Sequence, residues 1–163
     1  MSIRQPYALL IVLGFRMVEF RSFSLPAGTW FWVVSSGYEV DWSEFLHTLN
    51  SQHVTLRALE SRLHAISGYI APLCEYNFRF YFPTQTVLGK VLVEASKQCI
   101  LSYFQELNPQ PAKWPIVWEL ARMHYLPAQW RASFKKGRLP LFWLPQEITD
   151  YLEGHLMVYC EHE

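Results

Sequence analysis

Residues 2–21, SIRQPYALLIVLGFRMVEFR, decide how the N-terminal part folds, because helix and strand signals stand beside a group of charges. Pro6 suits the first position of a helix, where no N–H donor is needed. Gly14 suits the left-handed position that ends a helix. Residues 7–13 between them are all apolar, which predicts a short helix buried on nearly all sides.

A strand is predicted directly afterwards, over residues 17–23. Side chains of a strand point alternately to its two faces, so Val18 and Phe20 should face the core while Glu19 and Arg21 share the other face. This second face then carries an acceptor next to a fork of donors. The alternative is that Glu19 and Arg21 form a surface ion pair, worth about 0–1 kcal/mol.

Two further arginines flank the predicted helix. Arg4 precedes it and Arg16 lies in the turn after it, so both can converge with Arg21 on one cleft mouth. The helix N-terminus adds free N–H groups and a positive dipole end. Guanidinium groups suit phosphate oxygens, and Glu19 can accept a hydrogen bond from a base amino group. The pattern therefore predicts a cleft mouth that suits an anionic ligand.

The whole stretch resembles the ASCH domain, a member of the PUA-like group. The shared pattern is an S-x-R-Q-P-Y-A opening, an aliphatic run, and then G-x-R/K-x-x-E-x-R. It is most similar to that of small stand-alone ASCH proteins related to endothelial-overexpressed LPS-associated factors. The matching residues are Ser2, Arg4, Gln5, Pro6, Tyr7, Ala8, Gly14, Arg16, Glu19 and Arg21.

The resemblance implies an α+β fold, a PUA-like β-barrel of about five to six strands with helices packed outside. The resemblance covers residues 1–145 in outline, including a helical insert at 41–68. Residues 146–163 lie outside it and form an acidic C-terminal extension. The resemblance also implies that RNA, another single-stranded nucleic acid or a nucleotide-like ligand binds in a cleft lined by Arg4, Arg16, Glu19 and Arg21. The other expected binding residues are Gln5, Tyr7, Ser35, Trp118 and Lys136.

Some of these residues also have a purely structural interpretation. Ser35 either ends a strand at the cleft edge or begins a loop. Tyr7 or Trp118 would supply an apolar wall of the cleft. Lys136 lies in a basic turn that is either solvated or follows a phosphate backbone.

Catalysis is the alternative function that the resemblance raises. Some small ASCH-like proteins are amidohydrolases that deacylate N4-acetylcytidine, using a lysine at the G-x-K position and a threonine shortly after it. Arg16 and Glu19 stand at those positions here. An arginine stays protonated and is a poor base, which argues against this activity, although Glu19 is a candidate catalytic base. Ribonuclease activity is attributed to an ASCH-like group, but no residue trio here matches it. Whether the chain is an enzyme stays open, and the residues favour binding.

The rest of the chain supplies further strands and helices. Strands are expected over residues 29–36, 76–82, 86–95, 115–125 and 139–144, and helices over 42–49, 55–67, 100–107 and 146–152. The aromatic residues of 76–82 alternate with other residues and have three interpretations: a base-stacking surface, a docking surface for a protein partner, or core.

Composition narrows the class of protein. Residues 1–146 hold 14 basic and 9 acidic residues, a net charge of +5, so an acidic tail follows a basic body. Three widely spaced cysteines predict reduced thiols and a cytoplasmic location, or a nuclear one in a eukaryote. No apolar run reaches the ~20 residues of a membrane span, so no membrane partner is expected. No motif for a metal, a nucleotide loop or another cofactor occurs.

Overall fold

A curled sheet of six strands forms the centre of the computed structural model, which describes residues 1–135 and 141–159. The strand order is β1-β3-β4-β5-β2, and β6 pairs with the start of β4. Among the strand pairs of the described residues, β1 and β3 are parallel and the others are antiparallel. The strands are β1 (Ser2–Ile3), β2 (Val18–Arg21), β3 (Trp30–Ser35), β4 (Thr86–Gln98), β5 (Ile116–Tyr125) and β6 (Ala132–Ser133).

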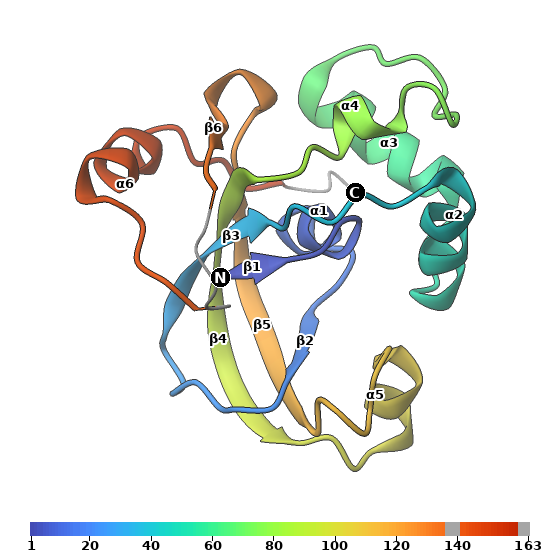
Figure 1. Cartoon of the computed structure of the whole chain (residues 1–163). Coiled ribbons are helices and arrows are strands. Elements are labelled where there is room, and N and C mark those ends of the chain that lie inside the picture. The colour runs from blue at the N-terminus through green and yellow to red at the C-terminus, as the bar shows by residue number, and fades with distance from the viewer. Residues whose placement is uncertain (136–140, 160–163) are drawn as a thin grey trace.

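Helices pack around this sheet. In Figure 1, α2, α3 and α4 lie together on one side, α5 lies near the far ends of β4 and β5, and α6 lies on the opposite side. The helices are α1 (Tyr7–Val12), α2 (Trp42–Ser51), α3 (Leu56–Ser67), α4 (Phe78–Tyr81), α5 (Ser102–Leu107) and α6 (Gln146–Glu153), with a 3₁₀ turn at Ala128–Trp130. The predicted α+β class, with five to six strands and helices packed outside them, is confirmed.

Local sequence signals place several of these boundaries. Asp41 caps α2 by accepting a hydrogen bond from the Glu44 N–H at 2.8 Å, and Thr55 caps α3 by accepting one from the Ala58 N–H at 3.1 Å. Gly14 has a φ of +82°, the left-handed conformation predicted for the end of the first helix. Pro6 stands just before α1 instead of at its first helical position.

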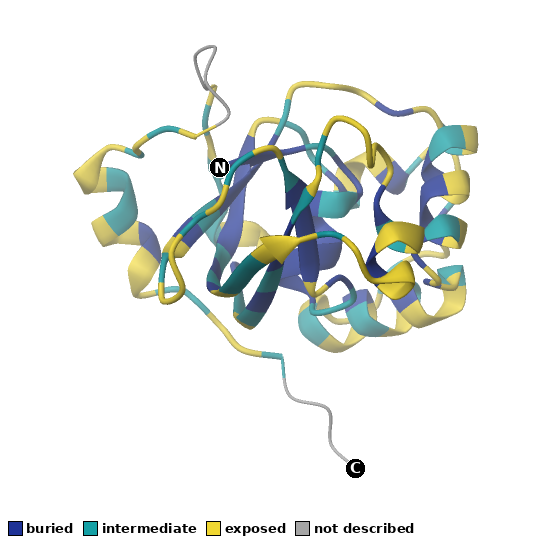
Figure 2. Cartoon of the chain, turned by 90° about the horizontal axis from the view of Figure 1, so that it is seen from below, coloured by how far each residue is buried: buried dark blue, intermediate teal, exposed yellow. Residues whose placement is uncertain are grey.

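The core lies between α1 and the sheet. Most of the length of the central strands is buried (Figure 2). Residues 8–12 of α1 are all buried, as the apolar run predicts. Val18 and Phe20 of β2 enter a second, smaller core with Phe104 and Val117. Glu19 and Arg21 therefore occupy the other face of β2, again as predicted.

Gly89 lets β4 approach β5 closely. A Cβ built on this glycine would lie 2.0 Å from the carbonyl oxygen of His124 on β5. The register between β3 and β4 shifts beside this position, between Val33 and Val34. This irregularity fits the bend or bulge that a glycine inside a strand predicts.

The predicted strand over residues 76–82 is wrong. The segment contains α4, preceded by a turn in which the Asn77 side chain accepts from the Cys74 N–H at 2.8 Å. Phe78 and Phe82 are buried, whereas Phe80 is 80% exposed. Phe78 and Phe82 are four residues apart, a spacing that also places two side chains on the same face of a helix. The aromatic pattern therefore fits either a strand or a helical turn.

The predicted last strand over residues 139–144 is also corrected. Residues 139 and 140 lie outside the described residues, and residues 141–144 form no strand. Phe142 and Leu144 instead pack on a small core around Leu126 and Leu152. Within the described residues, the last strand is β6, which pairs with the start of β4.

The predicted C-terminal extension contacts the rest of the fold at points that include Leu152 and Met157. Leu152 of α6 is fully buried, and Met157 forms an antiparallel bridge with Tyr125 at the end of β5. The acidic residues at 161 and 163 lie outside the described residues. Within residues 1–135 and 141–159, no helix is long and apolar enough to cross a membrane.

Candidate ligand-binding pocket

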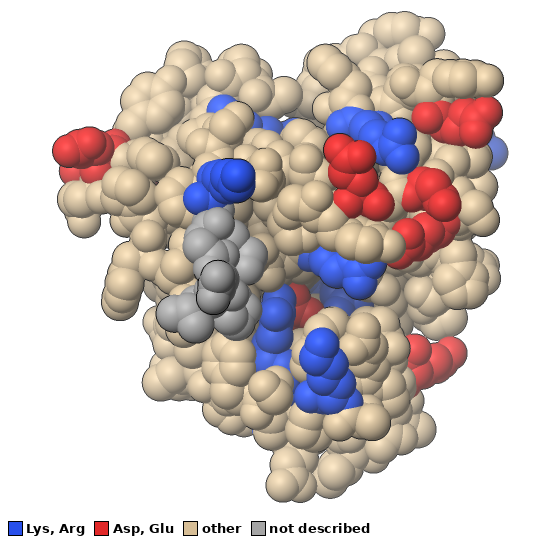
Figure 3. All heavy atoms as spheres, in the orientation of Figure 1, with Lys and Arg blue, Asp and Glu red and all other residues tan. Residues whose placement is uncertain are grey.

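A pocket of about 470 Å³ opens where β1, β2, α2 and the segment after α5 meet. Its volume lies within the ~300–1,000 Å³ typical of small-molecule sites. In the space-filling view, basic side chains gather around the hollow between α2 and α5, and acidic ones lie on the α2 side and beside α5 (Figure 3). The charged and amide side chains of its lining are Arg4, Gln5, Arg16, Glu19, Arg21, Glu44, His47, Gln52, Glu106, Asn108 and Gln110.

Arg16 is the most deeply buried cation of the pocket, only 4% exposed. One terminal nitrogen donates to Gln52 Oε1, and the other lies 3.4 Å from Glu19 Oε1. Its guanidinium stacks over the ring of Tyr7, 4.4 Å from the ring centroid. Burial lowers the pKa of Arg16, and the Glu19 carboxylate opposes that shift.

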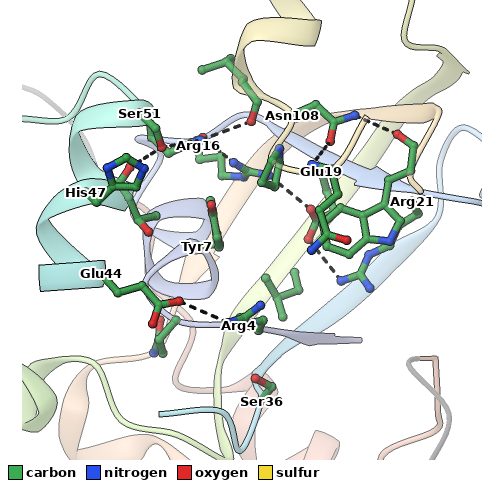
Figure 4. Close-up of a pocket in the computed structure, with 18 of the residues that line it drawn as sticks. Arg4, Tyr7, Arg16, Glu19, Arg21, Ser36, Glu44, His47, Ser51 and Asn108 are labelled. Carbon is green, nitrogen blue, oxygen red and sulfur yellow. Dashed lines mark hydrogen bonds and ion pairs between the residues drawn. The ribbon is translucent and has the colours of Figure 1, made fainter. Parts of the chain in front are cut away.

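Glu19 joins two arginines on the inner wall (Figure 4). Its Oε1 accepts from Arg16 and from the Phe20 N–H at 2.9 Å, and its Oε2 lies 3.3 Å from Arg21 Nη2. The carboxylate is 4% exposed, so this is a buried network and not a surface pair. The interpretation of Glu19 and Arg21 as a surface ion pair is therefore wrong.

Arg21 forms the adjoining part of the inner wall. Its Nη2 donates to the carbonyl oxygen of Ser2 at 3.0 Å, which ties β2 to β1. The guanidinium lies 5.9 Å from the centroid of the Trp114 ring, which also lines the pocket. Trp114 thus provides an apolar surface next to a donor.

Two donors of this wall have no acceptor. Among the buried side-chain nitrogen and oxygen atoms in the described part of the chain, Arg16 Nε and Arg21 Nε alone lack a hydrogen-bond partner. The large majority of buried polar side-chain atoms in folded proteins have a hydrogen-bond partner, and an unpaired buried donor costs about 1–3 kcal/mol. Both atoms belong to arginines that line the pocket, so its inner wall is where a ligand acceptor would relieve the most unpaired donors.

Arg4 lies at the mouth of the pocket, away from this network. Its guanidinium pairs with Glu44 of α2 at 3.3 Å and stacks over the Tyr38 ring at 3.6 Å. Both partners of the ion pair are exposed, with 41% and 38% of their side chains accessible. A pair this exposed contributes about 0–1 kcal/mol, so Arg4 can exchange Glu44 for a ligand anion at little cost.

The other predicted residues are placed unevenly. Tyr7 and Gln5 line the pocket, but both ends of the Gln5 amide are engaged: it donates to the Pro83 carbonyl at 2.9 Å and accepts from the Leu9 N–H at 3.1 Å. Gln5 therefore fixes the start of α1. Lys136 lies outside the described residues.

Ser35 and Trp118 do not reach the pocket. The buried Ser35 hydroxyl donates to the Pro83 carbonyl at 2.7 Å and accepts from the Thr86 N–H at 3.1 Å, while its neighbour Ser36 lines the pocket. Trp118 stands opposite Glu19 in the sheet, but its ring is fully buried in the main core and donates to the Phe23 carbonyl at 2.9 Å. Both residues hold the scaffold together.

The far wall of the pocket went unpredicted. Gln52 accepts from Arg16 and donates to the Leu107 carbonyl at 3.2 Å, so it links α2, the inner wall and α5. The Asn108 amide braces the loop by donating to the Trp114 carbonyl at 2.8 Å. The Asn-Pro-Gln-Pro sequence that stops α5 was the only hint of an ordered loop here.

The charges of the pocket divide into three zones. Arg16, Arg21 and Glu19 give the inner wall a formal charge of +1, Arg4 with Glu44 gives the mouth a charge of zero, and Glu106 on α5 adds −1, so the lining as a whole is formally neutral. No group of three metal-ligating side chains occurs in the described residues. The pocket can therefore offer charge-assisted donors and ring surfaces, which suit a planar or anionic organic ligand.

Comparisons with known proteins add little to this geometry. No family model matches the chain, and no curated protein does. Among solved structures, a crystal structure of ASCH from Zymomonas mobilis is 18% identical, covers 97% of this chain and 94% of its own, and has a TM-score of 0.47. Its S128A mutant is 18% identical, with coverages of 96% and 94% and a TM-score of 0.46. Similarity this distant carries no conclusion about family or function.

Proposed function

We propose that the pocket binds one nucleotide unit of RNA or another single-stranded nucleic acid, or a nucleotide-like ligand. The observation that supports this best is the pair of buried, unsatisfied Nε–H groups of Arg16 and Arg21. A phosphate oxygen or a base carbonyl oxygen would accept from either of them. The relation to stand-alone ASCH proteins that the N-terminal pattern implies agrees with this proposal.

The walls of the pocket also suit a nucleotide. Trp114 offers a ring face on which a base can stack, and such stacking contributes about 1–3 kcal/mol per base. The Nζ atom of Lys113 lies 5.6 Å from the centroid of the same ring, outside the pocket lining, and adds a cation near Trp114. Arg4 supplies a further cation at the mouth. A short single strand would thus meet cations on both sides of the base.

Hydrolysis is less well supported than binding. A general base needs a free acceptor within reach of the proton it removes. Both oxygens of Glu19 already accept from Phe20, Arg16 and Arg21. The N4-acylcytidine amidohydrolase alternative predicts release of acetate from N4-acetylcytidine, and an assay at high enzyme concentration that detects none would eliminate it.

The proposal is tested by binding of a short, labelled single-stranded RNA, followed by fluorescence anisotropy between 50 and 200 mM salt. Arg21→Gln should weaken binding about 10- to 100-fold, because a hydrogen bond to a charged group contributes about 1.5–3 kcal/mol. The logarithm of affinity should fall with the logarithm of salt concentration by about 0.7 per phosphate contact. The matched control is Arg57→Gln on α3, exposed and outside the pocket lining. Equal binding by Arg21→Gln and wild type would contradict the proposal.

A protein partner at residues 76–82 remains a separate proposal. The rings available for it are Tyr76 and Phe80, 92% and 80% exposed, whereas Phe78 and Phe82 are buried.

A cytoplasmic location likewise remains a proposal. Cys74 and Cys99 are free thiols, which agrees with a reducing compartment.

A further inference from the structure

We infer that Glu19 makes the pocket a charge filter, which accepts a phosphodiester or another group of one negative charge and disfavours a terminal phosphate of two. This inference rests on the proposed function and narrows its ligand class. It would separate nucleotides inside a strand from free nucleoside monophosphates. Glu19 acts here as a specificity-determining residue, not a catalytic one.

The first step is where the ligand must lie. The unsatisfied donors are the Nε–H groups of Arg16 and Arg21, so the ligand acceptor lies against these two guanidinium groups. The other edges of the same groups hold Glu19, at 3.4 Å and 3.3 Å. A bound anion would therefore contact the same two guanidinium groups as the Glu19 carboxylate, each along a neighbouring edge of the group.

The second step is the charge balance. Two guanidinium groups and one carboxylate leave a single positive charge on the inner wall. A ligand carrying one negative charge neutralises it, whereas one carrying two leaves a net negative charge in a place where Arg16 and Glu19 are both only 4% exposed. An uncompensated negative charge is costly in such a poorly solvated site, because neither water nor a further cation stabilises it there.

The third step is that Glu19 cannot move aside. The Phe20 N–H holds Oε1 at 2.9 Å, and Arg16 is itself fixed by Gln52 and by the ring of Tyr7. Arg4 behaves differently, because it lies at the exposed mouth and exchanges its partner readily. Arg4 therefore serves as a contact for the rest of a strand, while the inner wall selects for charge.

The experiment compares ligands that differ by one charge. Uridine, cytidine, adenosine and guanosine 5′-monophosphates are each titrated beside their own methyl esters, by calorimetry at pH 7.5 and pH 5.0. A phosphomonoester has a second pKa near 6, so it carries about two charges at the higher pH and one at the lower. The methyl ester carries one charge at both. The expected result is that the ester binds at least about tenfold more tightly at pH 7.5, a difference of about 1.4 kcal/mol, and that the difference disappears at pH 5.0.

The variant Glu19→Gln raises the inner-wall charge to +2 at nearly constant shape. It should remove or reverse the preference for the ester at pH 7.5, and its circular dichroism spectrum reports whether it is folded. If it does not fold, the pH comparison on the wild-type protein decides alone. Equal binding of ester and monophosphate by the wild type at pH 7.5 would overturn the filter but leave the proposed function standing. Binding of neither these compounds nor RNA would overturn both.

Discussion

Replacing Glu19 by alanine should destabilise the protein far more than replacing a surface glutamate. The side chain is 4% exposed and compensates two guanidinium groups, at 3.4 Å and 3.3 Å, while accepting from the Phe20 N–H. Removing one partner of a buried ion pair costs about 3–5 kcal/mol, because the remaining charge stays buried and unpaired. For a chain of this size, 1 kcal/mol corresponds to about 2–4 °C, so the melting temperature should fall by roughly 6–20 °C.

The assay is thermal and urea unfolding followed by circular dichroism at pH 7.5. The matched control is Glu44→Ala, which breaks a pair of similar length, 3.3 Å, between side chains that are 41% and 38% exposed. That change should cost about 0–1 kcal/mol. Equal melting temperatures for the two variants would refute the reasoning, because the Glu19 network would then contribute no more than a solvated pair.

Three further changes test other parts of the account. Gln52→Leu removes an acceptor from Arg16 and a donor to Leu107, and should cost about 1–3 kcal/mol in urea unfolding while weakening RNA binding. Gly89→Ala places a Cβ 2.0 Å from a backbone oxygen and should cost about 3 kcal/mol or more; a smaller change in the urea midpoint would contradict this. Burial, aided by Lys90, lowers the pKa of His124, so the folded state resists its protonation. Stability should hold above about pH 6.5 and decline as the pH falls below it, and His124→Gln should flatten that decline in a series of melting curves.

Short-range signals allowed the sequence to predict most helices and strands. The caps at Asp41 and Thr55 and the left-handed Gly14 are each determined within four residues of chain. The alternation on β2 likewise separated Glu19 from the core residues beside it. Patterns of this length depend on local geometry, which does not change with the rest of the fold.

The far wall of the pocket could not be predicted in this way. Gln52 meets Arg16 across 36 positions and Leu107 across 55, so only the packing of α2 and α5 on the sheet brings them together. The expectation that Trp118 lines the pocket failed for the same reason. Trp118 stands opposite Glu19 in register, yet other segments cover its ring, while Trp114 reaches the pocket from a loop.

The most direct test of the central claim observes the two unsatisfied donors themselves. The side-chain ¹H–¹⁵Nε signals of Arg16 and Arg21 can be followed by NMR and assigned with Arg16→Lys and Arg21→Lys. On addition of a short single-stranded RNA, both signals should move downfield and become protected from exchange with water, because each Nε–H gains an acceptor. RNA that binds and shifts other signals while leaving these two unchanged would contradict the account.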